Sequence, residues 1–293
     1  MPVLTAAVAA RPSSVGITVV GAVLLAAVLH AAWNALAHAI TDRLVGFALI
    51  GVGVSLGGAV LVLVSPAPDR ASWACLAGSA ALHVAYNLLL MRSYRLGEFG
   101  QVYPIARGTS PLLVAVGAAV LVGEDLSPVR LAGVLVISLG LGALVLVGGV
   151  PTRAARPAIA AAVLTGVSIA AYTTLDGIGV RSAGSVLGYT GWLFLLQGPW
   201  LPLGAAVVRR GALWRDLRPH LLTGLSGGAL SLAAYGLVLW AQTRGALAPI
   251  AALRETSVIV GAIIGAVLFG ERFGRWRIAA TVLVATGVVL ITL

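Results

Sequence analysis

Residues 107–124 read RGTSPLLVAVGAAVLVGE, and residues 254–271 read RETSVIVGAIIGAVLFGE. The two stretches align at a constant offset of 147 residues, and the match continues as far as Gly140 and Gly287. Two apolar helices often resemble each other by composition alone, but shared polar residues at fixed spacing indicate an internal repeat. The chain is therefore expected to consist of two related halves.

The composition excludes most soluble classes of protein. The 293 residues are 60% hydrophobic and 10% charged, whereas an ordinary soluble domain is about a quarter charged. A soluble enzyme, a nucleic-acid-binding protein and a disordered protein are excluded, because no soluble core could bury this much apolar surface. The remaining class is an integral membrane protein, with lipids as partners and a multi-pass location in the cell membrane.

The apolar runs predict ten transmembrane helices in an all-α fold, since each run is close to the roughly 20 residues that a membrane-crossing helix needs. The runs cover residues 16–38, 44–64, 72–92, 99–122, 128–149, 157–178, 185–208, 219–241, 246–269 and 274–293. The connections leave no room for a separate soluble domain.

The repeat divides the chain into residues 1–150 and 151–293, and the Pro- and Arg-rich segment 151–157 reads as the linker between them. Each half contains five predicted helices. Because five is odd, two consecutive copies must cross the membrane in opposite senses. The sequence therefore predicts two inverted five-helix repeats in one membrane domain, an architecture that many secondary transporters use to build a site at the bilayer midplane.

In these features the chain resembles the drug/metabolite transporter superfamily, and specifically its ten-helix EamA-like permeases. The resemblance is carried by Trp33-Asn34 in the first helix and by the paired Gly123-Glu124 and Gly270-Glu271 turns that precede the last helix of each half. It implies export or uptake of small organic solutes by alternating access. It also implies that the first, third and fourth helices of each half line the cavity, while the fifth is peripheral.

The orientation of the chain stays open. Twelve arginines follow the odd-numbered helices and five lie on the other side, so the positive-inside rule favours external termini. The resemblance implies cytoplasmic termini instead.

Two arginines within apolar runs, Arg107 and Arg254, are the leading candidates for the site. Charged groups at membrane depth usually face the bundle interior because they are costly in lipid. Pro104 and Pro249 precede them and allow a local break in the helix. The two guanidinium groups either face one central site and bind a carboxylate, phosphate or phosphonate, or act as structural ties neutralised by Glu255 or by helix carbonyls.

Two acids are candidates for coupling transport to a proton gradient. Glu255 is the most deeply placed acid, and its alternative role is that of an ion-pair partner. Asp176 is the rival, and its alternative is a position at the membrane interface, because it lies near a predicted helix end.

Further polar and aromatic side chains are expected to complete a substrate site at helical spacing around the arginines. These residues are Tyr103, Trp33, Asn34, His83, Asn87, Tyr172 and Tyr235. No metal site is identifiable and no cofactor is expected. The single cysteine, Cys75, excludes an intrachain disulfide.

The predicted function is that of a secondary transporter for an amino acid or another small organic anion. One alternative is an exporter of drugs or lipid-like compounds. Another is an intramembrane serine hydrolase, since Gly224-Leu225-Ser226-Gly227-Gly228 matches a nucleophile elbow, but no histidine follows Ser226 in the chain. Homodimer formation stays open, with small residues at i, i+4 available either for dimer contacts or for internal packing.

Overall fold

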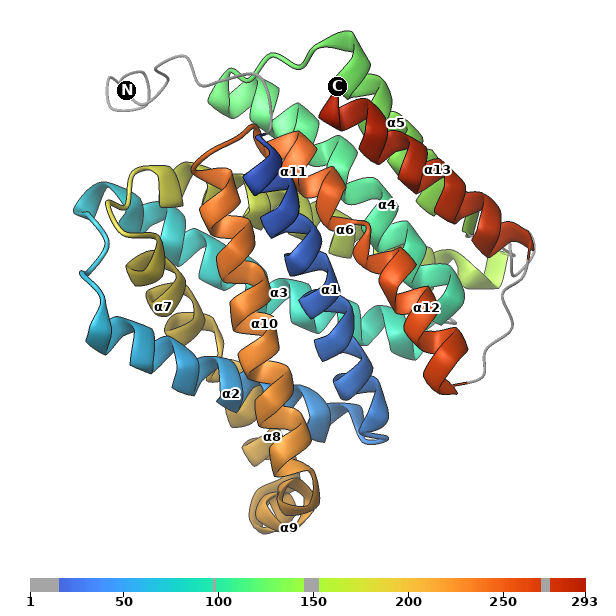
Figure 1. Cartoon of the computed structure of the whole chain (residues 1–293). Coiled ribbons are helices and arrows are strands. Elements are labelled where there is room, and N and C mark those ends of the chain that lie inside the picture. Colours follow the sequence, from blue (N-terminus) through green and yellow to red (C-terminus); the bar gives the residue numbers. More distant parts are fainter. Residues whose placement is uncertain (1–15, 97–98, 145–152, 270–274) are drawn as a thin grey trace.

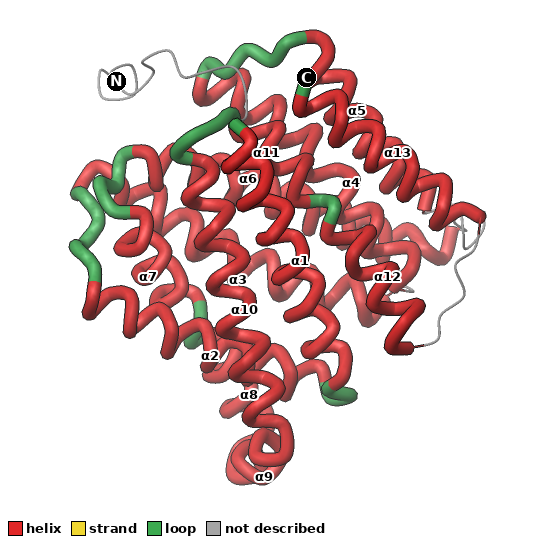
Figure 2. The backbone as a smooth tube through the Cα atoms, viewed as in Figure 1, coloured by secondary structure: helices red, strands yellow, loops and turns green. Residues whose placement is uncertain are grey.

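The structure, a computed structural model, describes residues 16–96, 99–144, 153–269 and 275–293. These ranges contain helices and no strand, which confirms the predicted all-α class (Figures 1 and 2). The α-helices are α1 (Ile17–Ala39), α2 (Arg43–Val64), α3 (Trp73–Leu96), α4 (Phe99–Gly117), α5 (Pro128–Ala143), α6 (Arg156–Arg181), α7 (Val186–Gln197), α8 (Trp200–Arg209), α9 (Leu213–Leu217), α10 (Leu221–Gln242), α11 (Leu247–Arg254), α12 (Ser257–Phe269) and α13 (Arg275–Thr292).

Two predicted runs are each divided between two helices. The run 185–208 becomes α7 and α8, which are separated at Gly198 and Pro199. The run 246–269 becomes α11 and α12, which are separated at Glu255 and Thr256. The break thus falls after Arg254, whereas Pro249 lies in the first turn of α11, where its missing N–H is not needed.

Six stretches qualify as membrane spans by length and hydropathy, and one of them, Val186–Gln242, contains α7 to α10. Two shorter apolar helices cover Pro128–Ala143 and Ile278–Thr292. The count of ten membrane crossings and the inversion of the repeat therefore stay predictions. Large apolar side chains such as Leu63, Val120 and Val207 are more than 70% exposed on the outside of the bundle, as expected of a surface that faces lipid.

Polar residues in the connecting turns set where several helices begin. Ser127 precedes Pro128, the first residue of α5, and its hydroxyl accepts from the backbone N–H of Arg130. Ser185 caps α7 in the same way, and the Asp42 carboxylate accepts from two backbone N–H groups at the start of α2. Such caps satisfy N–H groups that have no partner within the helix.

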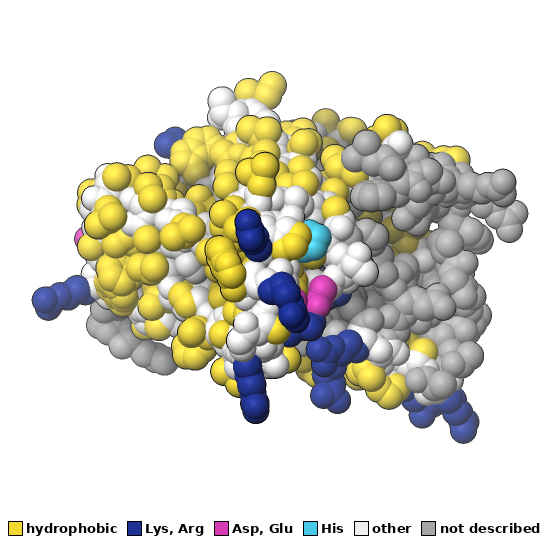
Figure 3. Space-filling view, turned by 90° about the horizontal axis from the view of Figure 1, so that it is seen from below, with side chains coloured by type: hydrophobic (Ala, Val, Ile, Leu, Met, Phe, Trp, Pro, Cys, Tyr) yellow, Lys and Arg dark blue, Asp and Glu magenta, His cyan; other side chains and the backbone are white. Residues whose placement is uncertain are grey.

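The bundle has two ends, which are named here by the short helices found there. At the α9 end, α1 finishes and α2 and α10 begin; at the α11 end, α6 and α10 finish and α11 begins (Figure 1). Basic side chains gather on the α9 end, which Figure 3 shows from below. There Arg209 forms an ion pair with Asp42 and so ties the end of α8 to the α1–α2 turn.

Two helix pairs cross so closely that only glycine fits at the contacts. A Cβ atom on Gly58 of α2 would lie 2.9 Å from the Gly191 carbonyl of α7. A Cβ atom on Gly133 of α5 would lie 2.8 Å from the Gly287 carbonyl of α13, while Gly140 of α5 lies against Ala280 of α13. Since residue numbers rise on α5 as they fall on α13, these two helices run antiparallel.

Two of the glycine pairs that the sequence offers for helix packing, Gly53/Gly57 and Gly224/Gly228, are used inside the bundle, whereas Gly261 has no atom within 4 Å of the position of a Cβ. Gly53 of α2 faces Leu225 and Gly228 of α10, and Gly224 of α10 faces Leu49 of α2. These glycines therefore pack α2 against α10 and are not available for a contact between two copies of the chain.

Candidate functional site

A partly open cavity of about 100 Å³ lies between the helices of the bundle. A water molecule needs about 10–15 Å³ by the same measure, so the cavity has room for a small solute. Its lining comes from α1, α2, α3, α6, α7, α8, α10 and α11, and thus from both halves of the chain. The lining residues are His30, Trp33, Phe47, Ile50, Gly51, Val54, His83, Tyr86, Asn87, Tyr172, Phe194, Gln197, Gly198, Leu201, Ser231, Tyr235 and Arg254.

Aromatic rings form one wall of the cavity. The His83 ring of α3 stacks on the Tyr172 ring of α6 with centroids 3.8 Å apart and planes 26° apart. The Tyr235 ring of α10 meets His83 edge-on at 5.3 Å and Phe194 edge-on at 6.1 Å. Because each ring is held by neighbours from other helices, the wall presents a fixed apolar surface to a solute.

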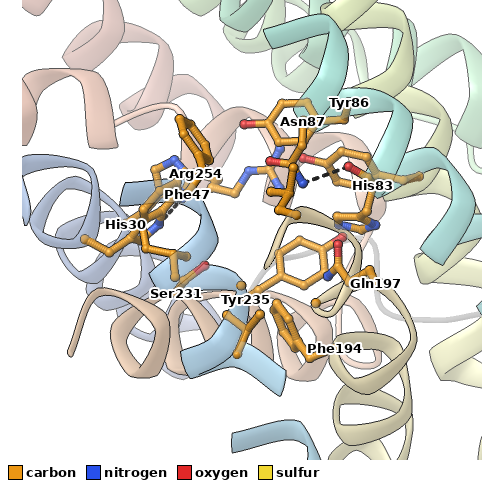
Figure 4. A pocket seen from close by; sticks show the side chains of 17 residues that line it. His30, Phe47, His83, Tyr86, Asn87, Phe194, Gln197, Ser231, Tyr235 and Arg254 are labelled. Atoms are coloured by element: carbon orange, nitrogen blue, oxygen red, sulfur yellow. Dashed lines mark hydrogen bonds between the residues drawn. The ribbon is translucent and has the colours of Figure 1, made fainter. Parts of the chain in front are cut away.

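Arg254 brings a positive charge to this cavity (Figure 4). The guanidinium lies between His30 and Phe47 on one side and Tyr86 and Asn87 on the other. Arg254 is 3% exposed, and its Nε and Nη2 atoms have no hydrogen-bond partner within the described structure. Among the described lining residues it is the one side chain with a formal charge.

The break between α11 and α12 places this side chain. Glu255 and Thr256 donate their backbone N–H groups to the carbonyls three residues earlier, at 3.0 and 3.1 Å, so the α-helical pattern stops at Arg254. A cation in the last turn of α11 is also favoured by the helix dipole. Half-helix ends of this kind face the substrate in many secondary transporters.

Arg107, the repeat counterpart of Arg254, is held in a different way. Its Nε lies 2.7 Å from Glu255 Oε2, and its Nη2 donates to Ser257 Oγ at 3.2 Å. Glu255 is fully buried, and its Oε1 is 3.9 Å from Arg254 Nη2. The ion pair therefore supports the structural-tie interpretation for Arg107, and the substrate-facing interpretation for Arg254.

Asp176 is fully buried on α6 and does not lie at the protein surface. Its two carboxylate oxygens accept from the hydroxyls of Tyr189 at 2.9 Å and Tyr235 at 2.5 Å. Tyr235 also lines the cavity, so a single tyrosine side chain connects the carboxylate to the cavity.

The structure gathers some of the predicted site residues at the cavity and leaves others outside its described lining. The lining includes Trp33, His83, Asn87, Tyr172, Tyr235 and Arg254. The residues outside it are Arg107, Tyr103, Asn34, Glu255 and Asp176. Asn34 donates to the His30 carbonyl at 2.7 Å, and Tyr103 lies one helical turn before Arg107 on α4.

Sequence reasoning missed the contribution of the second helix of each half. Phe47, Ile50 and Val54 of α2 face Phe194 and Leu201 of α7 and α8 across the cavity. These side chains are as apolar as those that face lipid, so their residue types do not distinguish them as cavity residues. The glycines at the α2–α7 crossing are the sequence feature that could have indicated their position. The expectation that the fourth helix lines the cavity holds for α11 only, since α4 supplies none of the described lining residues.

The remaining sequence motifs do not form chemical sites in the described part of the chain. Ser226 lies within the continuous helix α10, so the strained strand-to-helix turn of a nucleophile elbow is not formed there. The described residues contain no group of three or more His, Cys, Asp or Glu side chains that could hold a metal ion.

The helical bundle, its apolar outer surface and its cavity define a multi-pass membrane protein that can hold a small solute. Residues 156–293, a little under half of the chain, match the family model of the EamA-like transporter family, a family of membrane transporters of small solutes. This confirms the resemblance to the drug/metabolite transporter superfamily.

The fold also occurs among solved structures, 29 chains of which match. One crystal structure, described only as that of a protein, aligns with a TM-score of 0.70 at 20% identity, covering 92% of this chain and 95% of the other. At this identity the likeness extends to the fold alone. No curated protein matches the chain.

Proposed function

We propose that the protein is a secondary transporter that moves a small organic anion, such as an amino acid, through the central cavity by alternating access. The observation that carries the proposal is Arg254, a buried arginine that lines a cavity rich in aromatic rings and has two nitrogen atoms without a hydrogen-bond partner among the described residues. A guanidinium binds a carboxylate through two parallel hydrogen bonds, and the rings bind the apolar part of the same solute.

Packing between counterpart helices supports two inverted repeats of five helices. The contact between Gly140 and Ala280 is reciprocated by the contact between Gly133 and Gly287, which occupy the equivalent positions after the 147-residue offset. Since α5 and α13 run antiparallel, an approximate two-fold axis relates these two helices, and we propose that the same axis relates the halves that contain them. Rocking of residues 1–150 against 151–293 about this axis is the proposed transport movement.

The cavity favours this function over export of large drugs. Its volume of about 100 Å³ suits a small solute. A cationic drug would meet the positive charge of Arg254 with no acid among the described lining residues to balance it.

The direct test is counterflow in proteoliposomes that contain the purified full-length chain. The panel consists of amino acids, phosphonates and cationic drugs. We expect exchange of small anionic solutes with an apolar part and no exchange of the drugs. Exchange of cationic drugs alone would contradict the proposal and support the drug exporter instead.

We further propose that Asp176 carries the proton if transport is coupled to a proton gradient. Glu255 has Arg107 as a close counter-charge, whereas the hydroxyl groups that donate to Asp176 are neutral. A buried acid whose partners are neutral can accept a proton without breaking an ion pair.

Replacing Asp176 with Asn is expected to remove the stimulation of uptake by an imposed pH gradient, while counterflow persists. The amide keeps one acceptor oxygen for a tyrosine but has no titratable proton. Asp125→Asn, an exposed acid, is the matched control. Stimulation that persists in Asp176→Asn but disappears in Glu255→Gln would assign the coupling role to Glu255 instead.

A further inference from the structure

The Gly123-Glu124 turn, which belongs to the internal repeat, is part of a half-buried network at the α11 end. Glu124 Oε1 lies 2.8 Å from Arg181 Nη2, and the two side chains are 14% and 9% exposed. Glu124 Oε2 accepts from the backbone N–H of Leu247 at 2.7 Å. Each oxygen of this carboxylate therefore has its own partner.

Arg181 extends the same network to the turn between α10 and α11. Its Nε donates to the Gln242 carbonyl at 2.8 Å, and its Nη2 donates to the Gly245 carbonyl at 2.7 Å. The network thus joins the α4–α5 turn of the first half to the end of α6 and to both sides of the α10–α11 turn in the second half.

The contact with Leu247 acts directly on the helix that carries Arg254. Leu247 is the first residue of α11 and Arg254 is the last, and all eight residues of this helix are buried. The capping position, Ala246, has no side chain that could satisfy the first N–H groups. The Glu124 carboxylate supplies this cap from the other half of the protein, where a negative charge is also favoured by the helix dipole.

The network lies on the side of the cavity away from the α9 end. Along α6, Tyr172 lines the cavity, Asp176 follows four residues later, and Arg181 ends the helix. Between Tyr172 and the network, Asp176 binds Tyr189 of α7 and Tyr235 of α10. A solute that leaves the cavity toward the α11 end must separate these contacts and then the network.

We propose that Glu124 and Arg181 form a latch that closes the α11 end of the transporter and positions α11, and with it Arg254. The latch must open each time the cavity becomes accessible from that end, so its strength sets the balance between the two access states. This inference rests on the proposed alternating-access function. In this proposal the Gly123-Glu124 turn is part of the latch, and Glu124 is a positioning residue for Arg254.

Thiol labelling tests the latch independently of transport. Ser79 of α3 is fully buried, and its hydroxyl lies 3.2 Å from Nδ1 of His83, a cavity residue. In a full-length Cys75→Ser background, Ser79→Cys is a reporter of water entry on this side of the cavity. We expect Glu124→Gln and Arg181→Gln each to raise its labelling rate by a polar maleimide about tenfold, which corresponds to a shift of about 1.4 kcal/mol between the states.

Two comparisons make the result specific to the latch. The variant Asp125→Asn removes the same charge one residue away, at an exposed position, and should leave labelling unchanged. The double variant Glu124→Gln/Arg181→Gln should label more slowly than the product of the two single effects predicts, because both changes break the same ion pair.

Unchanged labelling in both single variants would overturn the latch, as would an equal increase in Asp125→Asn. Counterflow of the unmodified protein separates this failure from failure of the proposed function. If the unmodified protein exchanges solute but the variants label at an unchanged rate, the proposed transport function stands and the latch is wrong. If the variants label faster but the unmodified protein exchanges no solute, the latch stands and the proposed transport of anions is wrong.

Discussion

Replacing Arg254 with Gln is expected to reduce the affinity for the anionic solute by at least about 30-fold, or about 2 kcal/mol. This is the lower end of the cost of removing one partner from a buried, hydrogen-bonded charge pair. The fold should persist, because Glu255 keeps its contact with Arg107 at 2.7 Å. Equilibrium binding to the detergent-solubilised protein and counterflow in proteoliposomes both measure the effect.

Two further variants show whether charge or geometry matters at this position. Arg254→Lys keeps the charge but loses the planar pair of donors, so an intermediate affinity is expected. Arg215→Gln removes the same charge from a side chain that is 84% exposed at the α9 end, and should bind as the unmodified protein does. Unchanged binding by Arg254→Gln would mean that the solute is not held by this arginine.

Site residues could be predicted from the sequence where a charged or polar side chain occurs within an apolar run. Arg254 and Arg107 stood out because a charge in an apolar run is costly, and the repeat made them counterparts. Tyr172, His83 and Tyr235 stood out as polar rings in the middle of apolar helices. Their burial around one cavity follows from the same need to keep polar atoms away from lipid.

The different roles of the two arginines could not be read from the repeat. Glu255 has a glycine, Gly108, at the equivalent position in the first half, so one acid is available for two arginines. Which arginine it pairs with depends on how far each helix reaches into the bundle, and this is set by the break after Arg254. The helix does not break at Pro249, although a proline is the residue from which the sequence predicts a helix break.

The position of Asp176 shows a second limit. Its place near a predicted helix end and its glycine neighbours suited the membrane interface equally well. The deciding contacts come from Tyr189, thirteen residues later, and from Tyr235, 59 residues later. Such pairings depend on how three helices pack, and a pattern within one helix does not contain them.

The shared acid leads to an unusual expectation for Arg107. Replacing Arg107 with Gln should abolish binding of the anion although Arg107 does not line the described cavity. Without Arg107, Glu255 is left with Arg254, whose Nη2 is already 3.9 Å away, and a movement of about 1 Å would bring the two into a normal charged contact. Arg254 would then be neutralised from within the protein and unavailable to the solute.

A second substitution should reverse this loss. In Arg107→Gln/Glu255→Gln the internal competitor is removed, so Arg254 again faces the cavity with a free charge, and binding should return to within a few-fold of the unmodified protein. The single variant Glu255→Gln leaves two buried arginines without an acid, and breaking a buried pair in this way costs about 3–5 kcal/mol. We therefore expect it to have the lowest thermal unfolding temperature of the three in detergent.

Equilibrium binding and thermal unfolding of the three variants form a double-mutant cycle. Recovery of binding in the double variant is the decisive observation, because simple damage to the fold would accumulate with a second substitution. If the double variant binds no better than Arg107→Gln, then Arg107 contributes to the site directly and the two arginines act together on the solute. Recovery would instead establish that one buried carboxylate keeps Arg107 occupied and, by doing so, keeps Arg254 free for the transported anion.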